Sequence, residues 1–91
     1  MIDASPFFNA LGKRVRALRK RNGMTLDDVI SYGFSARHWQ QIEKGRQINM
    51  ITILRICALF QIPLAKFVRP LNFAVNLNDL RKQMIEVAGR R

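Results

Sequence analysis

The chain has 91 residues, with 16 lysines and arginines against 6 aspartates and glutamates and a net charge of +10. This length allows one small domain and excludes a second full one, and the positive charge attracts polyanions whatever the fold. The single cysteine excludes an internal disulfide, no apolar run reaches the roughly 18 residues of a membrane span, and the N-terminus lacks a signal-peptide pattern, so we expect a cytoplasmic protein without membrane contact.

The first predicted helix begins at Ser5 and Pro6, a residue pair that is common at helix starts, and runs to about Arg21. Gly23 is expected to end it. Apolar residues recur at helical spacing along it, namely Phe7, Phe8, Leu11, Val15 and Leu18. Its remaining surface is basic, which is typical either of a solvated helix face or of contact with phosphate. Arg14 is the candidate for a phosphate contact on this helix.

A second, short helix is predicted from Leu26, because Thr25 and Asp28 match a capping box with aspartate in place of glutamate. Val29 and Ile30 are its candidates for burial. Gly33 then provides the turn, since glycine readily adopts backbone conformations that side chains resist.

A third helix is predicted over 36–44, with Ser35 as its cap. At about 100° per residue, Trp39 and Ile42 fall on one face and are expected in the core. The opposite face carries Arg37, Gln40, Gln41 and Lys44.

Side chains of this outer face suit the DNA major groove. Arginine can donate two hydrogen bonds to guanine, glutamine can pair with adenine, and lysine meets phosphate as a point charge. The alternative is that these residues are simply good helix formers on a solvated face.

Three segments in order resemble the phage-repressor/Cro type of helix-turn-helix domain, the XRE family, over roughly Leu11 to Phe67: LGKRVRALRKRNGMT, GFSARHWQQIEKG and TILRICALFQIPLAKFV. The resemblance implies a mainly α-helical, five-helix domain over 1–69 whose third helix enters the major groove. It places base reading on Ala36, Arg37 and Gln41, with Gln40 adjacent, and Ala36 can contact only a thymine methyl. It also implies that Arg19 and Glu43 form a structural ion pair, which could instead be a weak surface pair.

The chain departs from the family pattern before Gly33. Fewer residues than usual separate Val29 from Gly33, so the angle between the second and third helices is expected to differ. Asp27 and Asp28 would repel a phosphate at the start of the second helix. Phosphate contacts are therefore assigned to residues that border the third helix, together with Arg14: Thr25, Ser35, Lys44, Arg46, Gln47 and Asn49.

Asn49 is expected to cap a fourth helix with a buried stripe of Ile53, Ile56, Cys57 and Phe60. Cys57 is interpreted as a core residue. His38, the only histidine, has no partner at ligand spacing, so neither a metal site nor a cofactor is expected. A short fifth helix ends near Val68.

Residues 70–91 lie outside the family pattern and are interpreted as a dimerisation extension. Leu71, Phe73, Val75 and Leu77 alternate with polar residues or alanine, which predicts a strand, and Asn78 would cap a final helix that carries Leu80 and Met84 and ends at Gly89. A lone strand leaves its backbone unpaired, so we expect it to pair with a second copy in a homodimer. The alternative is a tail that folds back over its own core. The expected dimerisation residues are Leu71, Phe73, Val75, Leu77, Leu80 and Met84.

Together these patterns predict a sequence-specific double-stranded DNA-binding transcriptional regulator, a repressor, that acts as a homodimer. The alternative is an antitoxin or phage-type binding module that also engages a protein partner through residues 71–91. An enzyme is not expected, because the sequence offers no paired carboxylates, nucleophile with base or phosphate-cradling glycine loop.

Overall fold

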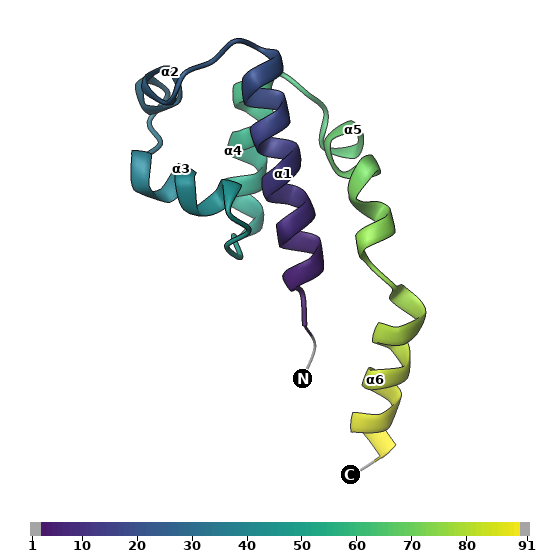
Figure 1. Cartoon of the computed structure of the whole chain (residues 1–91). Coiled ribbons are helices and arrows are strands. Elements are labelled where there is room, and N and C mark those ends of the chain that lie inside the picture. The colour runs from purple at the N-terminus through teal and green to yellow at the C-terminus, as the bar shows by residue number, and fades with distance from the viewer. Residues whose placement is uncertain (1–2, 90–91) are drawn as a thin grey trace.

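The computed structural model describes residues 3–89, so residues 1–2 and 90–91, at the outer ends of the predicted segments 1–69 and 70–91, lie outside it. Within the described range the chain is mainly helical, as predicted, with six α-helices, one 3-10 helix and no β-strand (Figure 1). In chain order they are α1 (Ser5–Arg21), α2 (Leu26–Ser31), α3 (Ala36–Glu43), α4 (Met50–Phe60), α5 (Leu64–Val68), the 3-10 helix η1 (Arg69–Ala74) and α6 (Leu77–Gly89).

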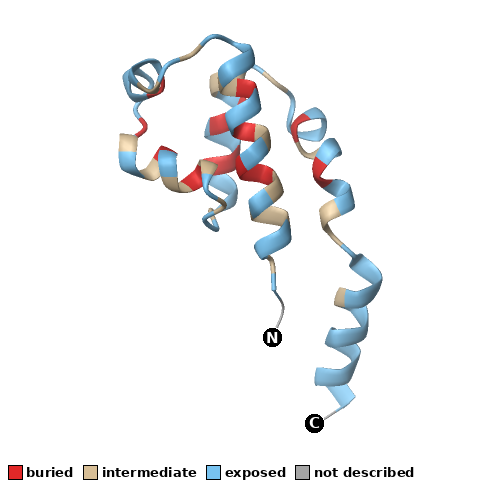
Figure 2. Cartoon of the chain, viewed as in Figure 1, coloured by how far each residue is buried: buried red, intermediate tan, exposed pale blue. Residues whose placement is uncertain are grey.

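The core lies where α1 meets α3, α4 and η1 (Figure 2). Trp39 and Ile42 are completely buried, as the helical spacing predicts, and Ile53, Ile56 and Cys57 form the buried stripe of α4. Phe34, which follows the turn, is also buried and packs edge-on against Trp39 with 5.0 Å between ring centroids.

Three of the predicted helix caps are present. The Thr25 hydroxyl accepts from the Asp28 amide while the Asp28 carboxylate accepts from the Thr25 amide, which completes the capping box of α2. Ser35 accepts from the amide of His38, and Asn49 caps α4. The start of α1 differs from the prediction, because its cap position is Ala4, and the carboxylate of Asp3 accepts from the Ser5 amide at 2.9 Å.

Two predictions for α2 and α3 are wrong in detail. Ile30 is 40% exposed rather than buried, because α2 has only six residues and turns only Val29 fully into the core. The predicted last residue of α3, Lys44, is instead the C-cap of that helix. Gly33 makes the predicted turn with φ 96°, in the left-handed region that glycine tolerates.

The predicted strand over 71–77 is wrong. Residues 69–74 form η1, and α6 begins at Leu77, where the Asn76 side chain rather than Asn78 accepts from the amide of Asp79. Helical turns satisfy their backbone groups within the segment, whereas an unpaired strand does not. Leu71 enters the core, while Phe73 remains 85% exposed.

α6 extends away from the helical body, and the molecule is accordingly elongated, with extents of 50 × 24 × 18 Å (Figure 1). None of its residues is buried. No single helix within residues 3–89 is long and apolar enough to cross a membrane; α4 and the segment Leu64–Ala74 would reach that length only together, and they are bent by 102°.

Candidate nucleic-acid interface

The buried side of α3 is attached to α1 by direct backbone approach. At Gly12 a Cβ atom would lie 2.5 Å from the carbonyl oxygen of Ile42 and 2.7 Å from that of Glu43. These distances are far below van der Waals contact, so only glycine allows α1 to lie this close to the end of α3.

Glu43, the last residue of α3, accepts hydrogen bonds from Arg19 of α1 and from Trp39 of α3 itself. Arg19 of α1 donates through Nε to Oε2 at 2.7 Å and through Nη2 to Oε1 at 3.3 Å, and the indole nitrogen of Trp39 donates to Oε2. Arg19 also donates to the carbonyl of Met24 at 3.1 Å. The hydrogen bond to Glu43 raises the pKa of Arg19, so the guanidinium stays charged, and its bonds to Glu43 fix the end of α3.

The other end of α3 is held from α4. Arg55 donates to the carbonyl of Gly33 at 3.2 Å, and its guanidinium carbon lies 4.3 Å from the ring centroid of Phe34. The cation-π contact with Phe34 and the hydrogen bond to Gly33 together restrain the turn that precedes α3. Sequence reasoning missed this role, although an isolated arginine within the apolar run Met50–Phe60 was a possible signal.

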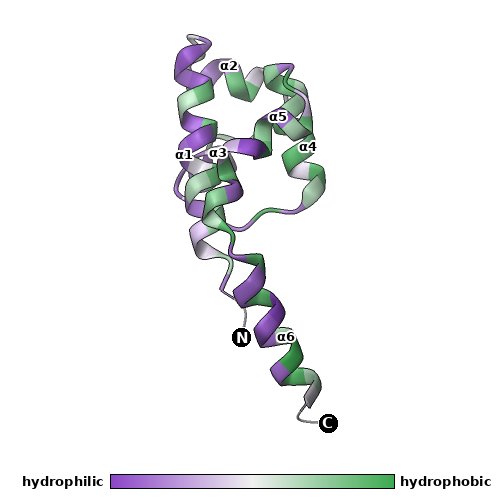
Figure 3. Ribbon diagram, turned by 90° about the vertical axis from the view of Figure 1, so that its right-hand side faces the viewer, coloured by the Kyte–Doolittle hydropathy of each residue, from purple (hydrophilic) through white to green (hydrophobic). Residues whose placement is uncertain are grey.

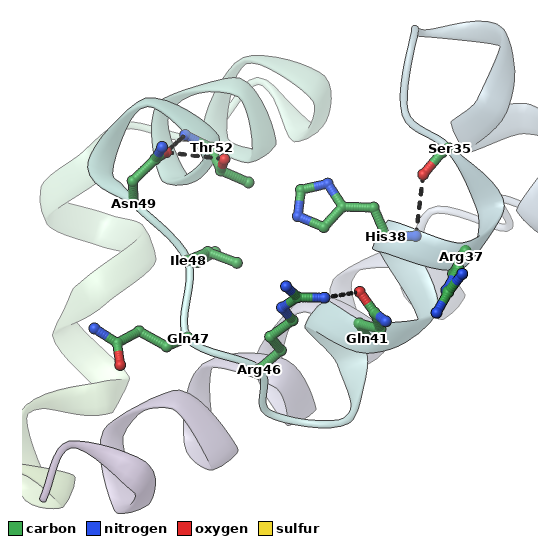
Figure 4. Close-up of a pocket in the computed structure, with 9 residues that line it drawn as sticks. All are labelled: Ser35, Arg37, His38, Gln41, Arg46, Gln47, Ile48, Asn49 and Thr52. Atoms are coloured by element: carbon green, nitrogen blue, oxygen red, sulfur yellow. Dashed lines mark hydrogen bonds between the residues drawn. The ribbon is translucent and has the colours of Figure 1, made fainter.

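The outer side of α3 borders a hollow of about 400 Å³ between α3, the following loop and the start of α4 (Figure 4). Six residues that the sequence singled out meet there: Ser35, Arg37, Gln41, Arg46, Gln47 and Asn49. His38, Ile48 and Thr52 also line the hollow. Arg37 is exposed, whereas His38 and Gln41 are half-buried.

Within the hollow, Arg46 bonds twice to Gln41. Its guanidinium donates to the side-chain oxygen of Gln41 (Figure 4), and its backbone amide donates to the Gln41 carbonyl at 3.0 Å. The loop is therefore joined to the exposed face of α3.

Several predicted site residues lie outside the hollow. Gln40 and Lys44 are exposed on or beside α3, and Ala36 is half-buried at its start. Thr25 is used in the α2 cap. Arg14 donates to the carbonyls of Phe67 at 2.6 Å and Lys66 at 3.1 Å, which joins α1 to the end of α5, and burial lowers its pKa.

Within residues 3–89 no three His, Cys, Asp or Glu side chains lie close enough together to hold a metal ion. The thiol of Cys57 is buried, and this burial raises its pKa, so it remains protonated as a core group. The chemistry available at the hollow is hydrogen bonding, by the positively charged guanidinium groups of Arg37 and Arg46 and by neutral amide and hydroxyl side chains.

Comparison with protein-family models finds no match, and no curated protein is significantly similar in sequence.

Proposed function

We propose that this chain is a sequence-specific double-stranded DNA-binding transcriptional regulator and that α2, its turn and α3 form a helix-turn-helix of the phage-repressor/Cro type. The observation that carries the proposal is the two-sided character of α3: Trp39 and Ile42 are completely buried, while Arg37 and Gln40 are exposed on the opposite face. An α-helix with such a face fits the major groove of B-form DNA. Repression requires only occupancy of the operator, so we propose a repressor.

The proposed contacts divide into two groups. Arg37, Gln40 and Gln41 read base edges, with Ala36 near a thymine methyl. Phosphates are bound by the residues around them, namely Thr25, Ser35, Lys44, Arg46, Gln47 and Asn49. Arg14 is not included, because its guanidinium is engaged with the end of α5.

Duplex DNA is a better target than RNA for this surface. The deep, narrow major groove of A-form RNA does not admit a helix, and sequence-specific RNA recognition relies on exposed aromatic stacking. Trp39, Phe34 and Phe67 are buried in this chain, and the exposed aromatic residues Tyr32 and Phe73 do not line the hollow beside α3.

We further propose that two copies associate through η1 and α6, so that two recognition helices read a palindromic site about one DNA turn apart. Apolar residues Leu77, Leu80, Met84 and Val87 recur along α6 with the three- and four-residue spacing of a helix–helix seam, and α6 presents both hydrophobic and hydrophilic surface (Figure 3). α6 has 13 residues and none buried, and isolated helices of about this length are marginal in water. A second copy that covers the seam would stabilise it.

The exposed seam also supports the alternative of an antitoxin or phage-type module, in which a different protein covers α6. Sedimentation of the full chain separates the two. A dimer at micromolar concentration that Met84→Glu converts to monomer, while Lys82→Glu on the polar side does not, supports self-association. A monomer at that concentration rules out the homodimer and leaves the heterologous partner.

Selection from a random duplex DNA pool tests the proposed function. Enrichment of a palindrome with half-sites about one helical turn apart supports it, and duplex RNA of the same sequence should compete poorly with the enriched DNA site for binding to the protein. A pool without an enriched sequence, or equal binding of RNA and DNA duplexes, contradicts the proposal.

A further inference from the structure

The hydrogen bond from Arg46 determines which end of the Gln41 amide faces the loop. A guanidinium has five N–H donors and no acceptor, so it can bond only the amide oxygen. The backbone bond from the Arg46 amide to the Gln41 carbonyl, 3.0 Å long, holds the loop at this place on α3. The side-chain and backbone bonds together orient the Gln41 side chain in the free protein.

This orientation leaves the amide nitrogen of Gln41, with its two N–H donors, available to a ligand (Figure 4). Arg37 lies one helical turn earlier and also lines the hollow, and its guanidinium is likewise a pure donor. The face that meets the bases therefore presents donors.

Bases differ in what they offer to such a face. Guanine shows two acceptors, N7 and O6, in the major groove, whereas adenine shows an acceptor and an amino donor, and the two-bond pair of glutamine with adenine needs both the amide nitrogen and the amide oxygen turned to the base. In this chain the oxygen is already bonded to Arg46.

We propose that Arg46 is a positioning residue for base recognition, which directs Gln41 to read acceptors, guanine foremost, instead of adenine. This inference rests on the proposed DNA-binding function and refines it. A phosphate contact by Arg46 alone would affect all sequences equally. The positioning role instead affects one base pair of the site.

The test uses selection from a random duplex pool with the full chain and with Gln41→Ala, Arg46→Ala and the double variant. The base pair at which Gln41→Ala loses preference identifies the position that Gln41 reads. There the unaltered chain is expected to select guanine, and Arg46→Ala is expected to reduce the preference for guanine over adenine at least about fivefold. In the Gln41→Ala background, Arg46→Ala should leave that position unchanged.

Gln41→Glu provides a second readout, of which group residue 41 presents to the bases. The carboxylate keeps the bond to Arg46 but replaces the amide donors by an acceptor, so the selected base should change to one with an amino group, such as cytosine. Lys66→Ala, which removes one positive charge from exposed α5, controls for charge. Thermal unfolding of every variant controls for folding.

Three results overturn the inference: selection of adenine at this position by the unaltered chain, equal weakening of all sequences by Arg46→Ala, or an Arg46→Ala effect on that position that persists without Gln41. If the pool enriches a site and one of these results follows, the inference alone fails. If no sequence is enriched, the proposed function fails with it.

Discussion

Replacement of Gly12 by alanine tests whether the close approach of α1 and α3 is essential. The new Cβ would lie 2.5 Å from the Ile42 carbonyl oxygen, whereas ordinary contact begins at 3.4 Å, so the two helices must separate by about 0.9 Å. Both obstacles are backbone atoms, so a side-chain rotation cannot relieve them.

Two opposing effects set the magnitude. Overpacking of this kind costs about 1–3 kcal/mol, and alanine recovers up to about 1 kcal/mol over glycine within a helix. We expect Gly12→Ala to lower the free energy of unfolding by about 1–2 kcal/mol, which lowers the Tm by roughly 5–15 °C for a domain of this size.

Calorimetry or thermal circular dichroism measures the shift. Gly89→Ala is the matched control, because a Cβ at Gly89 meets nothing within 4 Å, and its Tm should be unchanged or slightly higher. A Gly12→Ala protein that unfolds at or above the temperature of the unaltered chain would refute the argument, because it would show that α1 and α3 separate without loss.

Three further predictions concern the cap of α2, the contact of Arg55 with the turn before α3, and the exposed face of α3. The hydrogen bond from the Thr25 amide lowers the pKa of Asp28 below 3.8. The ionised Asp28 carboxylate therefore stabilises the folded protein above pH 3.8, and this stabilisation is lost as the pH falls further. In Asp28→Asn the Tm should decline less steeply below pH 3.8 than in the unaltered chain. Arg55→Ala should lower the free energy of unfolding by about 1 kcal/mol, since a hydrogen bond and a cation-π contact are lost. Hydrogen exchange of the backbone amides in the turn before α3 should also become faster. Unchanged exchange there would show that Arg55 does not restrain this turn. Arg37→Ala should weaken binding to the selected site by about 1–3 kcal/mol in a titration and relax one base preference, whereas charge-matched Lys66→Ala should relax none.

The helices were predictable where local chemistry decides them. Thr25, Ser35 and Asn49 each accept the amide bond that their position in the sequence predicts. Trp39 and Ile42 share a face because three residues span nearly a full helical turn. These features depend on neighbours within four residues, which a sequence displays directly.

The segment after Val68 was not predictable in the same way. Residues 71, 73, 75 and 77 alternate as in a strand, but the spacing of Leu77, Leu80 and Met84 also fits a helix, and over so short a segment periodicity alone does not decide. The absence of a partner strand among the described residues favours helical turns, and the sequence contains no direct signal of that absence.

In the candidate interface, sequence reasoning found the exposed residues and, through the family resemblance, the Arg19–Glu43 pair, but not the contacts of Arg14 and Arg55. The 100° spacing predicts that Arg37 and Gln40 face away from the core, as the structure has them. The contacts of Arg14 with α5 and of Arg55 with the turn join residues that are 53 and 22 positions apart. Separations of this size depend on how the helices pack, which local patterns do not specify.

These connections explain how α3 can be held in place although α2 is short. α2 has six residues and turns only Val29 fully into the core, although it packs directly against the helix that follows. The beginning of α3 is also restrained from α4 by Arg55, and its end from α1 by Gly12 and Arg19. The orientation of the proposed recognition helix therefore depends on α1, and on the contact of Arg55 with the preceding turn, as well as on α2, and substitutions at Gly12 or Arg55 should disturb base preference without touching a base.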